Sequence, residues 1–262
     1  MTEPLLTTKH NGVVTLTINR PYVRNAVDAE TMIRLRQEME RRAVEPDTRV
    51  FVITGAEGAF SSGADIQAAM SAGVTPQEAQ HILTEAYGPA IRGIRACPWP
   101  VIAAVDGFAA GIGCDLALAC DIRLLSERGK LAELFIRVGL IPDGGGTYLL
   151  PRLVGVGKAF EMMVTGETVN APDALAIGLA NKVFPTETFY ADVTAYAEKL
   201  ASQAPLALVR GKRAMYAALE DSSLAEAMAR EAQYQREIFD SEDGFEGFRA
   251  FVEKRPPQWK GR

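Results

Sequence analysis

The segment from Val101 to Leu125, which reads VIAAVDGFAAGIGCDLALACDIRLL, strongly constrains the fold of this chain. It predicts a strand, a glycine-rich turn, a helix and a second strand in immediate succession. Further strands are expected at GVVTLTI (12–18) and RVFVITG (49–55), with an amphipathic helix between them. This loose strand-strand-helix alternation predicts an α/β fold.

The last third of the chain has the pattern of packed helices rather than strands. Ser223 with Glu226 three residues later forms a capping signature, which predicts the start of a helix. Pro205 separates this region from the helix before it. We therefore expect a core domain over residues 1–204 and a helical module over residues 205–262.

The composition limits the classes of partner. With 262 residues, 48% of them hydrophobic, the chain can bury a large core. A net charge of −5 argues against a general affinity for nucleic acid. No apolar run is long enough to span a membrane, and the first ten residues lack the pattern of a signal peptide. We expect a cytoplasmic protein that contacts neither nucleic acid nor membrane.

The cysteine and histidine content bears on redox state and metal binding. Cys97, Cys114 and Cys120 lie in apolar surroundings and are expected to be reduced thiols. The chain has two histidines, His10 and His81, and no C-x-x-C pattern. No metal site is expected from this content.

One acid lies in an unusual setting, in the sequence LIPDGGGTYLL from Leu140 to Leu150. Three consecutive glycines are costly in backbone entropy, so the chain is expected to need a positive φ or a close backbone approach there. Asp143, fixed beside this turn between apolar segments, is predicted to be partly buried. It is therefore a candidate for acid-base chemistry.

Two further glycine turns each follow a strand: FSSGAD (60–65) and AAGIGCD (109–115). One backbone amide from each turn could converge on a single oxygen and stabilise an oxyanion. The amide of Ile112 would lie at a helix N-terminus, where negative charge is favoured. Tight turns in a packed sheet are the alternative. A dinucleotide-binding turn is disfavoured, because Leu116 stands where its third glycine is needed.

These segments resemble the crotonase family, also called the enoyl-CoA hydratase/isomerase superfamily. The resemblance runs from VVTLTINRP to FVEKRPPQW, with the markers NRPYVRNA, FSSGADI, PVIAAVDGFAAGIGCDLALACDIRL and GLIPDGGGTYLLPRLVG. It implies a spiral of strand-strand-helix units followed by a helical region for trimer formation, often with two trimers stacked. It also implies an acyl-CoA substrate and no cofactor other than the coenzyme A of that substrate.

The resemblance also implies roles for particular residues. The amides of Ala64 and Ile112 would hold the thioester oxygen. The other substrate-binding positions would be Arg24 near the CoA phosphates, Ser62 and Ala64 beside the adenine and thioester, Ile66 and Phe135 at the substrate, and Lys254 reaching a CoA on a neighbouring subunit. His81 would lie on the helix that lines the acyl pocket and is interpreted as a bystander.

The reaction depends on which acids are present. Hydratases of the family place glutamates at two positions that read Asp115 and Phe135 in this sequence, and phenylalanine cannot transfer a proton. Several isomerases place an acid at the position of Asp143. The resemblance therefore favours a double-bond isomerase, acting on an enoyl-CoA or a ring epoxide, with Asp143 as the base. Burial against Phe135, Leu140 and Ile141 should raise its pKa.

Alternatives remain open. Asp115 could support hydratase activity, or it could merely cap the helix that follows Gly113. Glu133 is interpreted as structural. A dehalogenase-like use of Asp143 is disfavoured, since the histidine it needs would fall near Gly88. A non-catalytic CoA- or RNA-binding protein is the alternative of another class.

Overall fold

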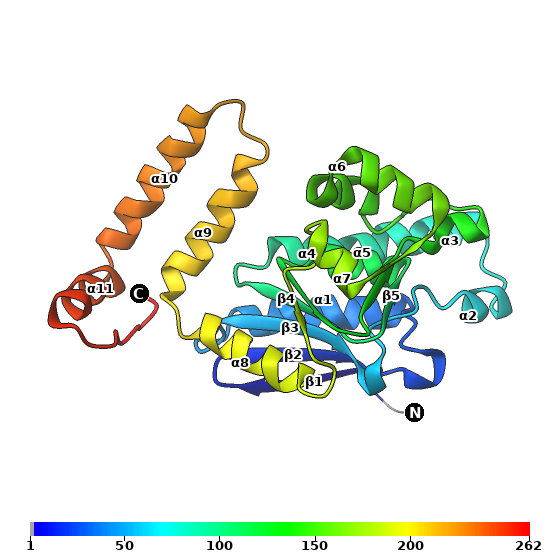
Figure 1. Cartoon of the computed structure of the whole chain (residues 1–262), viewed down its shortest axis with the longest axis horizontal. Helices are drawn as coiled ribbons and strands as arrows, with labels where there is room; N and C mark the ends of the chain where they lie inside the picture. Colours follow the sequence, from blue (N-terminus) through cyan, green and yellow to red (C-terminus); the bar gives the residue numbers. More distant parts are fainter. Residues whose placement is uncertain (1–2) are drawn as a thin grey trace.

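Two β-sheets form the centre of the protein, in a computed structural model that describes residues 3–262 (Figure 1). The larger sheet has the strand order β1-β2-β3-β4-β6-β9. These strands are β1 (Leu5–His10), β2 (Val13–Ile18), β3 (Val50–Gly55), β4 (Val101–Val105), β6 (Ile122–Ser126) and β9 (Lys182–Phe184). β1 and β2 are antiparallel, and all later neighbours are parallel. The carboxyl ends of β3 and β4 therefore share one edge of the sheet.

The smaller sheet lies beside that edge, with the order β5-β7-β8. Its strands are β5 (Phe108–Ala110), β7 (Lys130–Ala132) and β8 (Thr168–Asn170). β5 and β7 are parallel, whereas β7 and β8 are antiparallel. A single bridge between Ser61 and Ala109 joins the segment after β3 to β5. This bridge brings the two predicted glycine turns into contact.

Helices cover both sheets and form the C-terminal part of the chain (Figure 1). The α-helices are α1 (Ala29–Ala43), α2 (Ile66–Ser71), α3 (Pro76–Ile82), α4 (Gly88–Ala96), α5 (Ile112–Ala119), α6 (Gly146–Thr165), α7 (Ala171–Ala176), α8 (Phe189–Ala201), α9 (Pro205–Ala218), α10 (Leu224–Phe239) and α11 (Glu242–Glu253). Short 3₁₀ segments are η1 (Pro21–Val23), η2 (Ala56–Gly58) and η4 (Leu134–Val138), and a π-helical turn, η3 (Leu83–Tyr87), joins α3 to α4.

Strand β3 shows why the larger sheet needs helices on both faces. All six of its residues are buried. Phe51 and Ile53 contribute to a core that includes α1, α4 and α5, whereas Val52 belongs to a second core that α8 closes with Phe189. A parallel strand covered on both faces reads as a continuous apolar run, as VFVIT does. The strands predicted at 12–18 and 49–55 are confirmed as β2 and β3.

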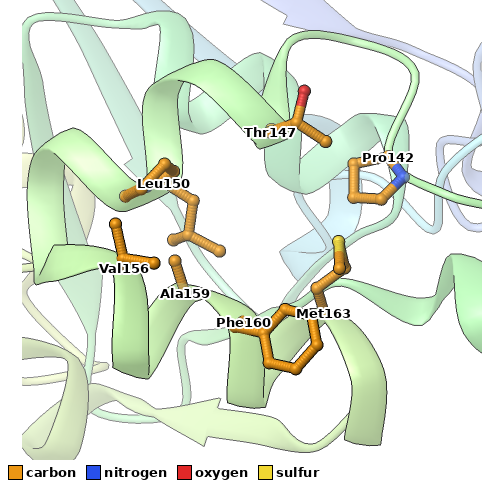
Figure 2. A pocket seen from close by; sticks show the side chains of 9 residues that line it. Pro142, Thr147, Leu150, Val156, Ala159, Phe160 and Met163 are labelled. Atoms are coloured by element: carbon orange, nitrogen blue, oxygen red, sulfur yellow. The ribbon is translucent and has the colours of Figure 1, made fainter.

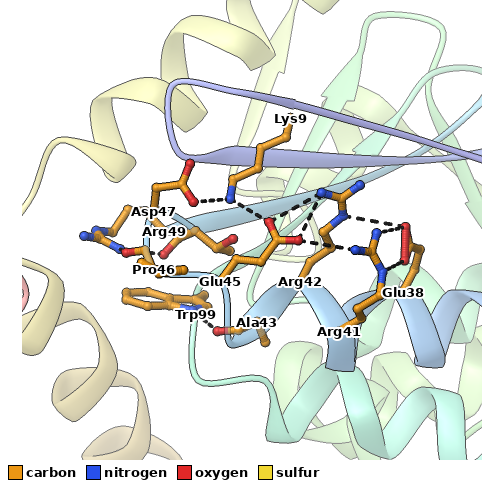
Figure 3. A network of polar contacts seen from close by, with 11 residues as sticks. Lys9, Glu38, Arg41, Arg42, Ala43, Glu45, Pro46, Asp47, Arg49 and Trp99 are labelled. Carbon is orange, nitrogen blue, oxygen red and sulfur yellow. Dashed lines mark hydrogen bonds and ion pairs between the residues drawn. The ribbon is translucent and has the colours of Figure 1, made fainter.

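A network of charged side chains ties β1 to the end of α1 (Figure 3). Lys9 pairs with Asp47 and, at 2.7 Å, with Glu45. Arg42 lies 3.1 Å from the same Glu45 carboxylate. Several partly exposed pairs of this kind contribute modestly to stability. Their main effect is to fix where the hairpin meets the first helix.

Helices α9, α10 and α11 extend away from the sheets (Figure 1). α9 begins at Pro205, after α8 has ended at Ala201. It is anchored by Lys212, whose ammonium group lies 2.7 Å from Asp121 and 3.0 Å from the Trp99 carbonyl. The division into two domains stays a prediction. Among residues 3–262, no helix has both the length and the apolar character that crossing a membrane would require.

Candidate active site

The first predicted oxyanion donor lies at the N-terminus of α5. Gly111 is the N-cap, with φ 53° and ψ −128°, and its N–H donates to the Ala132 carbonyl at 2.9 Å. Ile112 is the first helical residue, so its amide has no intrahelical partner. The unusual backbone angle falls on Gly111, and Ile112 adopts ordinary helical geometry. Isoleucine at this position therefore costs no backbone strain.

The second predicted donor, the Ala64 amide, lies on a turn attached directly to the first. Ser61 N–H donates to the Phe108 carbonyl at 2.9 Å, and Ala110 N–H donates back to the Ser61 carbonyl at 3.0 Å. The turns approach so closely that a Cβ on Gly113 would lie 2.7 Å from the Ser61 Cβ. Within residues 3–262, neither the Ala64 nor the Ile112 amide donates to another protein group. Each N–H could therefore donate to an acceptor that is not part of this segment of the chain.

Arg20 supports the Ala64 turn, and the sequence analysis did not identify it. Its buried guanidinium donates to the Ala26 carbonyl at 2.6 Å and to the Asp65 carboxylate at 2.8 Å. Asp65 in turn accepts from Ala68 N–H at 3.0 Å and so caps α2. The buried charge of Arg20 thus fixes the residue that follows Ala64.

Asp115 is fully buried on the fourth residue of α5 (0% exposed). Its Oδ2 accepts from the Gly144 N–H at 2.9 Å, and its Oδ1 has no hydrogen-bond partner in the described part of the chain. The prediction that Asp115 could cap its own helix is wrong, because Gly111 is the N-cap and Asp115 bonds to a different segment. It instead joins α5 to the turn that precedes α6.

That turn explains the three consecutive glycines. A Cβ on Gly144 would lie 2.8 Å from Asp115 Oδ2, and a Cβ on Gly146 would overlap Asp115 Oδ1. Gly145 has φ 95°, a conformation that favours glycine. The glycines therefore let the backbone pack directly onto the Asp115 carboxyl, so the predicted close approach is confirmed.

Glu133 lies immediately after β7 and is also fully buried (0% exposed). Neither oxygen of its carboxyl has a hydrogen-bond partner within residues 3–262. Burial raises the pKa of Glu133 to about 7, with a lowering contribution from the Cys114 thiol and a raising one from Asp143. From the sequence alone, Glu133 is interpreted as structural. The only sequence signal was a lone acid in the apolar run LAELFI.

The environment also favours the neutral form of the buried Asp115 carboxyl. Burial is the largest cause that raises its pKa well above the usual range, and the neighbouring charge of Glu133 is the next. The Gly144 N–H acts in the opposite direction by stabilising the carboxylate. Two carboxyls that face one another in an apolar environment cannot readily ionise together.

Asp143 differs from these two because it is exposed at the protein surface. Desolvation by the surrounding protein still raises its pKa, in the direction expected from the sequence. The predicted cause was partly wrong: Leu140 and Ile141 are 55% and 69% exposed and cannot desolvate it well. Tyr87 donates to the Val27 carbonyl at 2.9 Å, and its pKa is raised chiefly by burial, then by Asp28 and by Asp143.

Phe135 forms an apolar wall beside the turn at Gly111. Its side chain is nearly buried (8% exposed), and its ring would lie 3.8 Å from a Cβ placed on Gly111. The position therefore carries no group that could transfer a proton. It excludes water from one side of the turn instead.

The predicted CoA-contacting residues are only partly brought together. Ser62 N–H donates to the Arg24 carbonyl at 3.0 Å, and both residues are exposed next to Ala64. Ile66, half exposed, begins α2 on the same side. Lys254 lies at the end of α11, far from α5 within one chain (Figure 1). Its predicted reach to a neighbouring subunit stays a prediction.

An apolar cavity of about 320 Å³ opens between the two halves of α6, which are divided by a break at Gly155 (Figure 2). Its lining residues are Pro142, Gly146, Thr147, Leu150, Pro151, Val156, Ala159, Phe160 and Met163. None of them is titratable. None of the carboxyl cluster, formed by Asp115, Glu133 and Asp143, is among the residues that line this cavity.

Comparison with known proteins gives the family. Residues 8–262 match the model of the enoyl-CoA hydratase/isomerase family. The chain belongs to this family. The crotonase resemblance seen in the sequence is thereby confirmed, as is the α/β fold with C-terminal helices. The protein is accordingly an enzyme of the enoyl-CoA hydratase/isomerase family.

Several relatives of this family member align over nearly their whole length. A probable enoyl-CoA hydratase of Rhodobacter capsulatus is 38% identical over 251 residues, covering 96% of this chain and 95% of the relative. The 2,3-dehydroadipyl-CoA hydratase of Escherichia coli is 34% identical, with coverage of 98% and 99%. The enoyl-CoA hydratase structure from Bacillus anthracis has a TM-score of 0.95 at 32% identity, with coverage of 99% and 100%.

Proposed function

We propose that this enzyme is an enoyl-CoA isomerase, which moves a double bond in an acyl thioester by proton transfer. The observation that carries this proposal is the difference among the three carboxyls. Asp143 alone is exposed, whereas Asp115 and Glu133 are buried and hold their protons more tightly. When carboxyl groups in one site differ in pKa, the group that loses its proton more readily can act as the base, and a group that keeps its proton can act as an acid. Asp143 is the group suited to act as base.

The N–H groups of Ala64 and Ile112 would donate hydrogen bonds to the thioester oxygen. When Asp143 takes a proton from the α-carbon, the C–H electron pair moves into the thioester and an enolate forms. Fixed donors aimed at the developing oxyanion lower the barrier, each by roughly 3 to 4 kcal/mol. Return of the same proton from Asp143 to the γ-carbon completes the shift of the double bond. One carboxylate is sufficient for this sequence.

A hydratase is the second candidate, and two observations favour it. Most of these relatives are named as hydratases, including the crotonyl-CoA hydratase of Syntrophomonas wolfei at 35% identity. In addition, Glu133 lies beside Asp115, so this chain has a second buried carboxyl although position 135 is phenylalanine. A water molecule between two such acids could be added to a 2-enoyl thioester.

Turnover by the purified protein separates these candidates. The substrates are a 2-enoyl-CoA, a 3-enoyl-CoA and an aryl-epoxide CoA thioester. We expect the 3-enoyl-CoA or the epoxide to be isomerised faster than the 2-enoyl-CoA is hydrated. Faster hydration would refute the isomerase assignment and favour the hydratase.

We further propose that the enzyme assembles as a trimer or hexamer. The extended α11 presents Phe245, Phe248 and Phe251 to solvent, each more than 60% exposed. An apolar surface of this kind on a projecting helix is typical of an interface. Light scattering at micromolar concentration is the test, and a purely monomeric protein would contradict the assembly.

A further inference from the structure

Glu133 is a buried acid for which the isomerisation described above has no use. Both of its carboxyl oxygens lack a hydrogen-bond partner in the described part of the chain, and the residue is 0% exposed. An apolar side chain at this position would avoid the cost of burying an unpartnered polar group. A specific role in the site would account for the acid.

Two backbone hydrogen bonds place Glu133 in the site. Gly111 N–H donates at 2.9 Å to the carbonyl of Ala132, the residue before Glu133. Gly144 N–H, on the residue after Asp143, donates to Asp115 at 2.9 Å. The three segments that carry Asp115, Glu133 and Asp143 therefore come together at the N-terminal half of α5.

The titratable groups that face Glu133 are Asp115 and Cys114 of α5 and Asp143 of the segment before α6. The charged side chains of neighbouring elements have other partners: Lys130 lies over the Phe108 ring, Arg137 donates to the Gly166 carbonyl, and Lys158 pairs with Glu161. Within residues 3–262, no cation pairs with Glu133. Once ionised, its charge would be uncompensated.

We propose that Glu133 is a positioning residue that must keep its proton for the site to stabilise an enolate, so that its ionisation sets the upper pH limit of activity. The inference rests on the proposed enolate chemistry. With Glu133 neutral, the site holds the charge of Asp143, which passes to the thioester oxygen during proton transfer. With Glu133 ionised, a second negative charge opposes that transfer in a poorly solvated environment. The Glu133 proton itself is not transferred.

The test compares Glu133→Gln, which is neutral at every pH, with the matched control Glu127→Gln on the surface. For whichever enoyl-CoA the wild type converts, kcat/KM is measured from about pH 5.5 to about pH 9. We expect wild type and control to lose activity above about pH 7, on the order of tenfold, and Glu133→Gln to retain it. The same alkaline loss in Glu133→Gln would overturn the proposal.

A binding measurement keeps this test independent of turnover. Acetoacetyl-CoA presents an enolate to the site, so the ratio of Glu133→Gln affinity to wild-type affinity should rise on the order of tenfold from about pH 6 to about pH 8.5. A constant ratio would contradict the role of Glu133. A rising ratio without isomerase turnover would reject the proposed function alone. If the glutamine variant does not fold, Glu133→Met supplies a neutral side chain of similar volume.

Discussion

Replacing Glu133 by glutamine should stabilise the protein at neutral pH but not at acidic pH. The Glu133 carboxyl is fully buried without a hydrogen-bond partner, and burial raises its pKa to about 7 from an ordinary value of 4.5. Between these two values the folded protein keeps a proton that the unfolded chain has lost. The free energy of unfolding therefore falls as pH rises through this window and stays reduced above it.

The size of the effect follows from the two pKa values. A difference of about 2.5, from about 7 against 4.5, corresponds to about 3 kcal/mol at about 1.36 kcal/mol for each unit of pH. Glutamine has no charged form, so the variant avoids this loss. Glu133→Gln should thus be about 3 kcal/mol more stable than wild type at pH 8 and nearly equal to it at pH 4.

Urea unfolding at a series of pH values, at one fixed protein concentration, measures this difference. Glu127→Gln is the control, because Glu127 is exposed and its replacement should change stability by less than about 0.5 kcal/mol at every pH. A stability difference between Glu133→Gln and wild type that does not grow from pH 4 to pH 8 would refute the assignment of a buried, protonated carboxyl at this position.

The remaining predictions concern the other parts of the site. Asp143→Asn should lower kcat for a 3-enoyl-CoA by about 10²- to 10⁴-fold. Asp115→Asn should lower kcat much less, because an amide oxygen can also accept the hydrogen bond from the Gly144 N–H. If steady-state assays show the reverse order of losses, the hydratase is favoured. Gly146→Ala should destabilise the protein by about 1 to 3 kcal/mol in urea unfolding, because the added Cβ overlaps Asp115 Oδ1. The control Gly157→Ala should not destabilise the protein, because a Cβ at Gly157 would lie in open space. Equal effects of the two substitutions would count against the packed turn. Arg20→Lys should lower the free energy of unfolding by about 1 to 3 kcal/mol and should also lower kcat, since one ammonium group cannot reproduce the contacts to Ala26 and Asp65. An unchanged kcat would show that the position of Ala64 does not depend on Arg20.

Local patterns in the sequence were enough to predict β2, β3, β4 and β6, together with α1 and the glycine turns, whereas β1, β7, β8 and β9 were not predicted. Met32, Leu35 and Met39 fall on one helix face, and all three are buried in the core. Ser223 likewise caps α10 by accepting from the Glu226 N–H, so the helix start predicted from the sequence is confirmed. Such features depend on residues a few positions apart, so their physical causes are visible in the sequence itself.

The contacts that define the carboxyl cluster are not local. Asp115 bonds to Gly144, 29 positions later, and this bond excludes the capping role that its helical context suggested. The burial of Glu133 depends on the parallel pairing of β5 with β7, which no short pattern encodes. Motif resemblance directed attention to Asp115, Phe135 and Asp143, but it carried no information on the unpartnered acid between them.

The two turns are attached to each other through Ser61 and Ala110. The main-chain groups of these turns are kept when a side chain is substituted, whereas the carboxyl side chains of the site are not. The proposed oxyanion donors are main-chain atoms of Ala64 and Ile112, so a substitution at either position leaves the N–H in place unless it is to proline. The carboxyls of Asp115, Glu133 and Asp143, by contrast, are side chains on three separate segments, and each can be exchanged alone. A gene encoding this scaffold can therefore acquire or lose proton-transfer groups one codon at a time while thioester activation is inherited intact.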